Sequence, residues 1–166
     1  EGAFDADKVM SAKERKRVDD FIIYAVAAAD EALEDAGWKP ESEEDKERTG
    51  VIIGSGIGGL GPVADTAIKL KEEGPRRISP FFIPMMIANM PAGQTSIAFG
   101  LRGPSSCVVT ACAGGTNAVG DAFKIIQRGD ADVMVAGGVE ACISPAAVAG
   151  FCSMKALSTR NDEPTK

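Results

Sequence analysis

Apolar residues recur at two different spacings along the 166-residue chain. Between residues 12 and 36 they return every three or four positions, which predicts one helix that breaks near Asp19 and ends at Gly37. Ser11 and Glu14 form a capping box at its start. Short apolar runs predict buried strands at 51–53, 107–110 and 133–136. Further helices are predicted over 62–73, 91–99 and 113–128.

The order of these elements predicts the fold class. The strand at 107–110, the helix at 113–128 and the strand at 133–136 form a βαβ unit, which implies parallel strands. Helices that alternate with apolar strands are typical of an α/β layered fold. Residues 38–48 are charged and are predicted to form a solvated loop, and the proline-rich stretch 75–90 is predicted to be irregular.

Composition excludes several classes of function. The chain has no histidine, so it can form no Ser-His-Asp triad, Cys-His pair or histidine metal site by itself. A general base would have to be Asp, Glu, Lys or a group from outside this chain. The 18 basic and 24 acidic residues give a net charge of −6, which argues against broad nucleic-acid binding. The hydrophobic fraction of 45% is that of an ordinary globular domain.

Cysteine spacing and apolar run length limit the setting of the protein. The four cysteines form no C-x-x-C pair, so we expect no zinc cage and reduced thiols in the cytoplasm. The apolar run 21–29 is nine residues long, well short of the roughly 18 that cross a bilayer. There is no recognisable signal peptide. We therefore expect no metal and no membrane partner.

Cys112 is the candidate nucleophile. It stands among small residues between a predicted strand and a predicted helix, in the arrangement that exposes a nucleophile at a sharp turn. A helix N-terminus favours a thiolate and can lower a cysteine pKa from about 8.5 to about 3.5–7.5. The residues alone leave open the alternative of a small buried apolar thiol. The settings of Cys107, Cys142 and Cys152 favour a nucleophile much less.

Residues 54–59, GSGIGG, match the G-x-G-x-x-G pattern of dinucleotide-binding turns. That pattern requires an acidic residue about 20 positions later, at the end of the next strand. Glu72 and Glu73 instead end a predicted helix. The sequence therefore favours a glycine-rich turn against which other segments pack closely.

Lys13, Arg15, Lys16 and Arg17 form a basic cluster at the start of the first helix. On an acidic protein such a cluster is either a solvated face or a docking site for an anionic partner. The residues alone favour the solvated face.

Six segments, in order, resemble those of the β-ketoacyl-acyl-carrier-protein synthases, the elongating condensing enzymes of the thiolase superfamily. They are GSGIGGL at 54–60, ISPFFIP at 78–84, GLRGP at 100–104, VTAC at 109–112, GDADVMVAGG at 129–138 and ALSTRN at 156–161. The resemblance is greatest to the type II members of bacterial fatty acid synthesis. It covers nearly the whole chain.

The resemblance implies a thiolase-like fold with α-β-α layers, of which residues 1–166 are the N-terminal β-ketoacyl synthase domain. The family's first strand and its C-terminal half are expected to be absent from these residues. Apolar faces that the missing layers cover would then lie bare.

Particular residues take on family roles through the resemblance. The family's nucleophile falls on Cys112, and two residues of its acyl pocket fall on Ile57 and Phe82. Its carrier-protein docking residues fall on Lys13, Lys16 and Arg17, which reverses the preference for a solvated face. The family is a homodimer, and residues 105–110 would lie at its two-fold axis.

The implied reaction uses no cofactor. Cys112 would take an acyl chain from acyl-carrier-protein, and malonyl-carrier-protein would lose carbon dioxide and attack the resulting thioester. The family's histidines and lysine lie beyond Lys166, so residues 1–166 alone are expected not to condense. A non-catalytic half-domain or assembly partner, and a nucleotide-binding oxidoreductase built on the glycine turn, are the alternatives.

Overall fold

Three parallel strands form the sheet of the described residues in a computed structural model, which describes residues 4–163 and 165. They are β1 (Thr49–Gly54), β2 (Ser105–Ser106) and β3 (Val133–Gly138), in the order β2-β1-β3. All six residues of the central strand β1 are buried. This explains why β1 has a continuous apolar run rather than alternating polarity.

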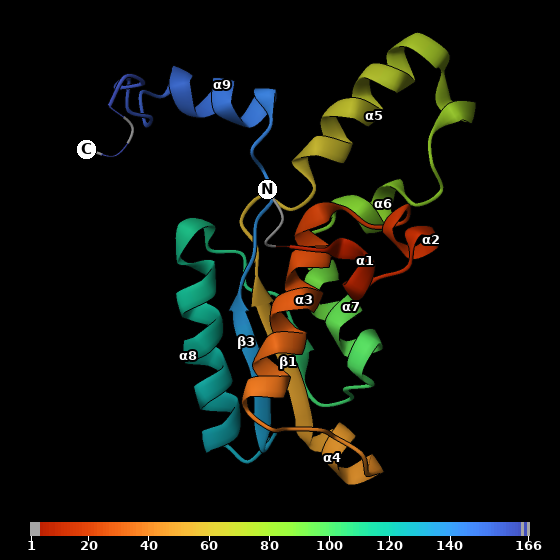
Figure 1. The fold of residues 1–166 in the computed structure, drawn as a ribbon, viewed down its shortest axis with the longest axis vertical. Helices are drawn as coiled ribbons and strands as arrows, with labels where there is room; N and C mark the ends of the chain where they lie inside the picture. The colour runs from red at the N-terminus through yellow and green to blue at the C-terminus, as the bar shows by residue number, and fades with distance from the viewer. Residues whose placement is uncertain (1–3, 164, 166) are drawn as a thin grey trace.

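Helices cover both faces of the sheet (Figure 1). Ile52 of β1 packs against Ala118 and Ala122 of α8 (Gly114–Gln127). Val51 and Ile53 pack on the opposite side, against α3 (Asp20–Asp35) and α7 (Met90–Phe99). Successive residues of a strand point to opposite faces, so one strand serves two cores. The predicted α-β-α layering is confirmed.

The predicted helix over 12–36 is broken, as expected, near Asp19. It consists of α2 (Ala12–Arg15), which carries the Ser11–Glu14 capping box, and α3. A further short helix, α1 (Ala6–Val9), precedes them. Asp19 has extended backbone angles and directly precedes α3, so the chain changes direction there. Burial raises the pKa of the Asp19 carboxyl.

Two stretches are more ordered than their composition indicates. Residues 38–48 contain α4 (Glu43–Arg48), because Ser42 and Asp45 form a second capping box whose polar residues resemble those of a loop. The stretch 75–90 contains the single turn η1 (Pro75–Arg77) and α6 (Phe82–Met86). The predictions of a plain loop and of an irregular stretch are therefore wrong in part.

The strand predicted at 107–110 is displaced. The pairing residues are Ser105 and Ser106, which carry no apolar signal, while 107–110 leave the sheet towards the next helix. One further hydrogen bond, from the Ser55 N–H to the Val108 carbonyl at 3.2 Å, continues the contact. β2 and β3 are parallel as predicted, but β1 lies between them.

Two helices project from the layered body (Figure 1). The predicted helix at 62–73 is α5 (Leu60–Glu73), and α9 (Pro145–Ser153), which was not predicted, follows β3. Gly100 and Gly129, after α7 and α8, have positive φ angles of 66° and 78°, as expected of glycines that end helices. No helix in the described ranges has the length and apolar character needed to cross a membrane.

Candidate active site

Cys112 lies at a strained turn that leads into α8. It is the middle residue of η2 (Ala111–Ala113), a single 3-10 turn, and its side chain is exposed. Ala111 has a φ of 50°, in the left-handed region that non-glycine residues rarely adopt. Strain of this kind concentrates at functional sites and costs of the order of 1–3 kcal/mol. The sequence predicted a sharp turn here, but not that an alanine would be its strained residue.

The start of α8 leaves hydrogen-bond donors near this turn. The first N–H of α8, that of Gly114, donates to the Ala111 carbonyl, and Ala113 has no side chain that could cap the N–H groups that follow it in the first turn. The Asn117 side chain donates to Thr110 Oγ1 at 3.0 Å and thereby joins the helix to the approach of the turn. The arrangement can stabilise an oxyanion that forms next to Cys112.

The glycine turn at 54–59 packs directly against the turn that carries Cys112. A Cβ atom at Gly54 would lie 2.5 Å from the carbonyl carbon of Gly114, and one at Gly138 would lie 2.8 Å from the Cα of Gly115. Real Cβ atoms do not come so close, so the backbones meet here only because side chains are absent. The prediction of a turn for close packing is confirmed.

Glu140 fills the donor side of the same turn. Its Oε1 accepts hydrogen bonds from the Gly56 N–H, from the Ile57 N–H at 3.3 Å and from the Ser55 hydroxyl at 3.4 Å. A phosphate would need these backbone donors. The N–H groups of the turn are therefore occupied by the protein's own carboxylate. This argues against the alternative of a nucleotide-binding oxidoreductase.

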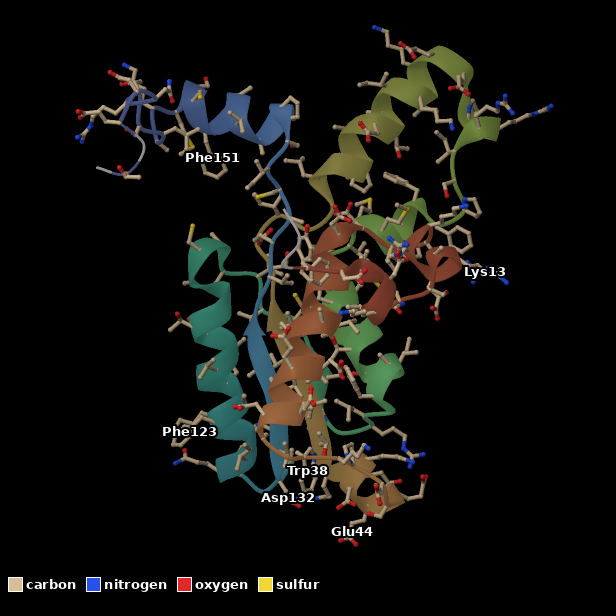
Figure 2. The ribbon with its side chains drawn as sticks, in the orientation of Figure 1. Lys13, Trp38, Glu44, Phe123, Asp132 and Phe151 are labelled. Carbon is tan, nitrogen blue, oxygen red and sulfur yellow. The ribbon has the colours of Figure 1, made fainter. Side chains whose placement is uncertain are left out.

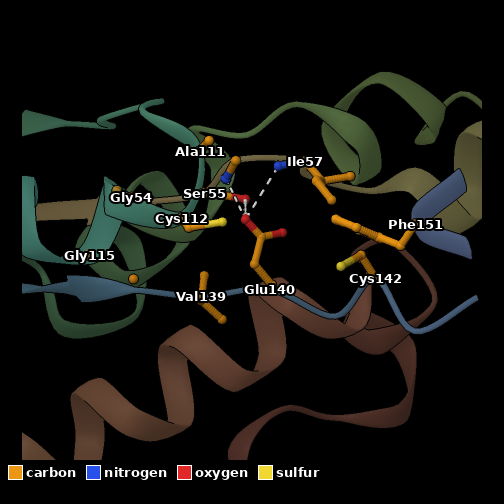
Figure 3. Close-up of a pocket in the computed structure, with 13 residues that line it drawn as sticks. Gly54, Ser55, Ile57, Ala111, Cys112, Gly115, Val139, Glu140, Cys142 and Phe151 are labelled. Atoms are coloured by element: carbon orange, nitrogen blue, oxygen red, sulfur yellow. Dashed lines mark hydrogen bonds between the residues drawn. The ribbon is translucent and has the colours of Figure 1, made fainter. Parts of the chain in front are cut away.

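A hollow of about 570 Å³ opens between these segments. Its walls include Cys112, Ile57, Glu140, Cys142 and Phe151 (Figure 3). Most of the remaining lining residues are glycines or small apolar residues, which leave room for an apolar ligand. Within the described ranges, no group of three His, Cys, Asp or Glu side chains is placed to hold a metal ion.

The structure brings together only part of the predicted site. Ile57 shares the hollow with Cys112 and is 40% exposed. Phe82, at the start of α6, is half-buried and does not line that hollow. The glycine motif and the cysteine motif meet because β1 and the segment after β2 both end at the same edge of the sheet.

The predicted docking residues lie apart from the hollow. Lys13, Lys16 and Arg17 are exposed on α2 and on the link to α3. The Arg17 guanidinium stands 5.0 Å above the ring centre of Phe81, a cation–π contact that joins this link to the segment preceding α6. Lys13 points outward in Figure 2.

The other cysteines have different settings. Cys107 Sγ donates to the Ala88 carbonyl at 3.2 Å, and burial raises the pKa of its thiol. Cys142 lines the hollow and Cys152 is exposed on α9.

Sequence reasoning missed Glu140. Its signal is an acidic residue two positions after β3, next to a strand that ends in a glycine turn. Side chains that follow neighbouring parallel strands gather at one edge of the sheet. That rule, applied to β1 and β3, would have placed Glu140 near the turn.

The profile of the family described as "Beta-ketoacyl synthase, N-terminal domain" matches residues 1–166. The chain belongs to this family. It is 59% identical to the 3-oxoacyl-[acyl-carrier-protein] synthase 2 of Rhizobium meliloti over all of its length and 40% of the relative's. It is 50% identical to the protein of the same name from Synechocystis over 97% of its length and 38% of the relative's.

Solved structures agree with the family. A β-ketoacyl synthase from Burkholderia phymatum matches with a TM-score of 0.82 and 31% identity, over 98% of this chain and 40% of that one. A ketosynthase solved in complex with its type II PKS acyl-carrier protein matches with a TM-score of 0.84 and 27% identity, over 90% of this chain and 43% of that one. The predicted thiolase-like fold is confirmed, and the chain spans about 40% of the length of these relatives.

Proposed function

We propose that this chain is the nucleophile-bearing N-terminal domain, residues 1–166, of a β-ketoacyl-acyl-carrier-protein synthase that elongates fatty acids in the cytoplasm. The observation that carries the proposal is the position of Cys112, exposed on a strained turn before α8 and inside a largely apolar hollow. The names of the relatives support the same reaction class.

The first chemical step is transfer of an acyl chain to Cys112. The thiolate attacks the carbonyl carbon of an acyl-carrier-protein thioester, a new C–S bond forms, and the carrier's thiolate leaves. The Cys112 N–H and the uncapped first turn of α8 stabilise the oxyanion of the intermediate. The acyl chain then lies in the hollow beside Ile57.

The second step forms the carbon–carbon bond. Malonyl-carrier-protein loses carbon dioxide, the electron pair of the broken bond attacks the Cys112 thioester, and the Cys112 thiolate leaves. The product is a β-ketoacyl-carrier-protein two carbons longer. The family supplies histidines and a lysine for this step, and residues 1–166 contain no histidine. We therefore expect no condensation by these residues alone.

A bare apolar face supports the proposal that a further part of the protein covers this one. Val119, Phe123 and Ile126 recur at helical spacing on α8 and are 56%, 57% and 43% exposed. Large apolar patches on a protein surface mark contact with another surface. The relatives, which are about two and a half times as long as this chain, are long enough to supply one.

Acyl-carrier-protein is the proposed partner, in both its acyl and malonyl forms. Lys13, Lys16 and Arg17 form an exposed basic cluster on a chain of net charge −6, so an anionic partner is attracted here and repelled elsewhere. A similar ketosynthase has been solved in complex with an acyl-carrier protein.

A homodimer is proposed across the outer edge of β2. Ser105 and Ser106 are exposed edge residues, and β1 is the only strand paired with them among the described residues. Ile97 and Val109 are 73% and 60% exposed. An unpaired strand edge with apolar neighbours favours pairing with a second copy. Phe82 does not line the hollow beside Cys112 within one chain. Its predicted role in the acyl pocket therefore requires that dimer formation bring it to the pocket.

The intact mass of the protein after incubation with an acyl thioester tests the function. We expect one acyl adduct, lost in Cys112→Ala and retained in Cys152→Ala, which removes the other exposed cysteine. An adduct that survives in Cys112→Ala would refute the assignment of the nucleophile. β-Ketoacyl product from residues 1–166 alone would contradict the division of the active site.

A further inference from the structure

Glu140 forms hydrogen bonds with residues that lie 83 to 85 positions earlier in the chain. Figure 3 shows its carboxylate between Ile57 and Cys112, with hydrogen bonds to the glycine turn. All three hydrogen bonds converge on one oxygen, Oε1. A single carboxylate oxygen therefore holds the Ser55–Ile57 segment, and a charged acceptor strengthens each bond.

The backbone sets Glu140 in this place. The Val139 N–H donates to the Gly54 carbonyl at 3.0 Å, which extends the pairing of β3 with β1 by one residue. Glu140 is the next residue, at the level where β1 has turned away into the glycine segment. Its carboxylate therefore meets the N–H groups that the end of β1 leaves unpaired.

The turn is held between Glu140 and the nucleophile segment. A Cβ atom at Gly56 would lie 3.1 Å from the Cα of Ala111 and 3.3 Å from Glu140 Oε1. Inside the turn, the buried Ser55 hydroxyl also accepts from the Gly58 N–H at 3.2 Å. A movement of the Glu140 carboxylate would therefore move both the turn and Ile57, which forms a wall of the hollow.

We propose that Glu140 is a positioning residue that fixes the Ser55–Ile57 turn and thereby sets the shape of the acyl pocket beside Cys112. The inference rests on the proposed function, because it takes the hollow as an acyl pocket. Glu140 acts through Ile57 and not on the sulfur, because its Oε1 is occupied by hydrogen bonds from the turn.

Alkylation of Cys112 tests this role without any thioester chemistry. The protein is treated in separate experiments with iodoacetamide and with N-decyl-iodoacetamide. Iodoacetamide is small enough to reach the Cys112 sulfur without entering the hollow, whereas the decyl chain must enter it. Peptide mass spectrometry gives the rate at Cys112 for each reagent. In Glu140→Ala, we expect the ratio of the decyl rate to the iodoacetamide rate to change by roughly fivefold or more, because the wall of the pocket is displaced.

Matched variants separate geometry from charge and from folding. Glu140→Gln can place its amide oxygen at the Oε1 position, so its ratio should stay within about twofold of the original. Glu140→Asp keeps the charge but is one methylene shorter, so its ratio should shift as in Glu140→Ala. Glu31→Ala, on the exposed surface of α3, should change nothing. Circular dichroism confirms that each variant is folded.

Three outcomes would overturn the proposal. They are an unchanged ratio in both Glu140→Ala and Glu140→Asp, an equal change in the rates of both reagents, and a Glu140→Gln ratio that shifts as far as that of Glu140→Ala. A failure of the proposed function has a different signature. An acyl thioester would then leave Cys112 unmodified, while the alkylation ratio would still report on Glu140.

Discussion

Gly54 shows how one missing side chain joins two motifs. It ends β1, and its Cα faces the backbone of Gly114 at the start of α8. The contact holds the glycine turn against the turn that carries Cys112, so the position of Cys112 depends on a residue that has no side chain. A glycine here is required by space and not by its φ angle, which is not in the left-handed region.

Gly54→Ala should therefore damage both stability and the site. A methyl group 2.5 Å from backbone atoms forces a shift that costs roughly 1–3 kcal/mol of unfolding free energy. Urea denaturation measures the loss, and iodoacetamide labelling of Cys112 measures the effect on the site. The control is Gly120→Ala inside α8, where a Cβ meets no atom within 4 Å and should stabilise by roughly 0.5–1 kcal/mol. Equal effects of the two substitutions would contradict the close-packing argument.

At the scale of elements, an ion pair joins the beginnings of β1 and β3. Arg48 directly precedes β1 and donates through Nε and Nη2 to the two oxygens of Asp132 at 2.9 and 2.6 Å, and through Nη1 to the Gly129 carbonyl at 2.9 Å. Asp132 directly precedes β3. The pair therefore fixes the register of the two strands at one end, as the Val139–Gly54 bond does at the other.

The same pair should make stability depend on acid. The hydrogen bonds from Arg48 hold the pKa of Asp132 below its usual value. The stabilisation is therefore present above the ordinary aspartate pKa of about 3.9 and is lost as the pH falls through the lowered value. Asp132→Asn should lower the urea midpoint at neutral pH and reduce its further fall in acid.

The control for this acid dependence is Asp121→Asn, which neutralises a different exposed carboxylate, one that lies on α8. We expect its urea midpoint to follow the original protein across the pH range. If Asp132→Asn and Asp121→Asn gave the same profiles, the Arg48–Asp132 pair would have no part in fixing the strands.

At the scale of the whole molecule, the basic cluster around α2 lies apart from the apolar face of α8. Figure 2 places Lys13 and Phe123 on opposite sides of the sheet and its helices. A carrier protein bound to the basic cluster would therefore leave the apolar face of α8 free for the rest of the protein. The carrier protein and the rest of the protein can therefore bind at the same time, because they contact different surfaces.

Charge reversal at Lys16 and Arg17 tests the docking surface. The double variant to Glu should weaken binding of acyl-carrier-protein by about tenfold and flatten its salt dependence, because two attractive charges become repulsive. Binding is measured by isothermal titration at low and high salt. The variant Lys39→Glu/Lys124→Glu has the same change in net charge away from the cluster and should bind nearly as well. Unchanged affinity in the first variant would rule out this docking surface.

The sequence alone determined the elements whose signals are local. The periodicity of α3, the apolar run of β1, the capping box at Ser11 and the glycines that end helices all act within a few residues, so they were predicted. Cys112 was found for the same reason, since a strand, a small-residue turn and a helix are adjacent in the chain. The prediction missed α4 because the polar residues that cap a helix are also common in loops. It placed the second strand too late in the sequence because Ser105 and Ser106 carry no apolar signal.

Only the tertiary structure decided how the site is assembled. Glu140 accepts hydrogen bonds from N–H groups that lie 83 and 84 residues earlier. Nearly every residue type has a backbone N–H, so the sequence does not indicate which N–H groups Glu140 contacts. The strained angle of Ala111 and the absence of Phe82 from the hollow also depend on how distant segments pack. Residue types specify local conformation and motif, whereas the pocket is formed where the ends of β1 and β3 meet the start of α8, and that meeting is a property of the folded sheet.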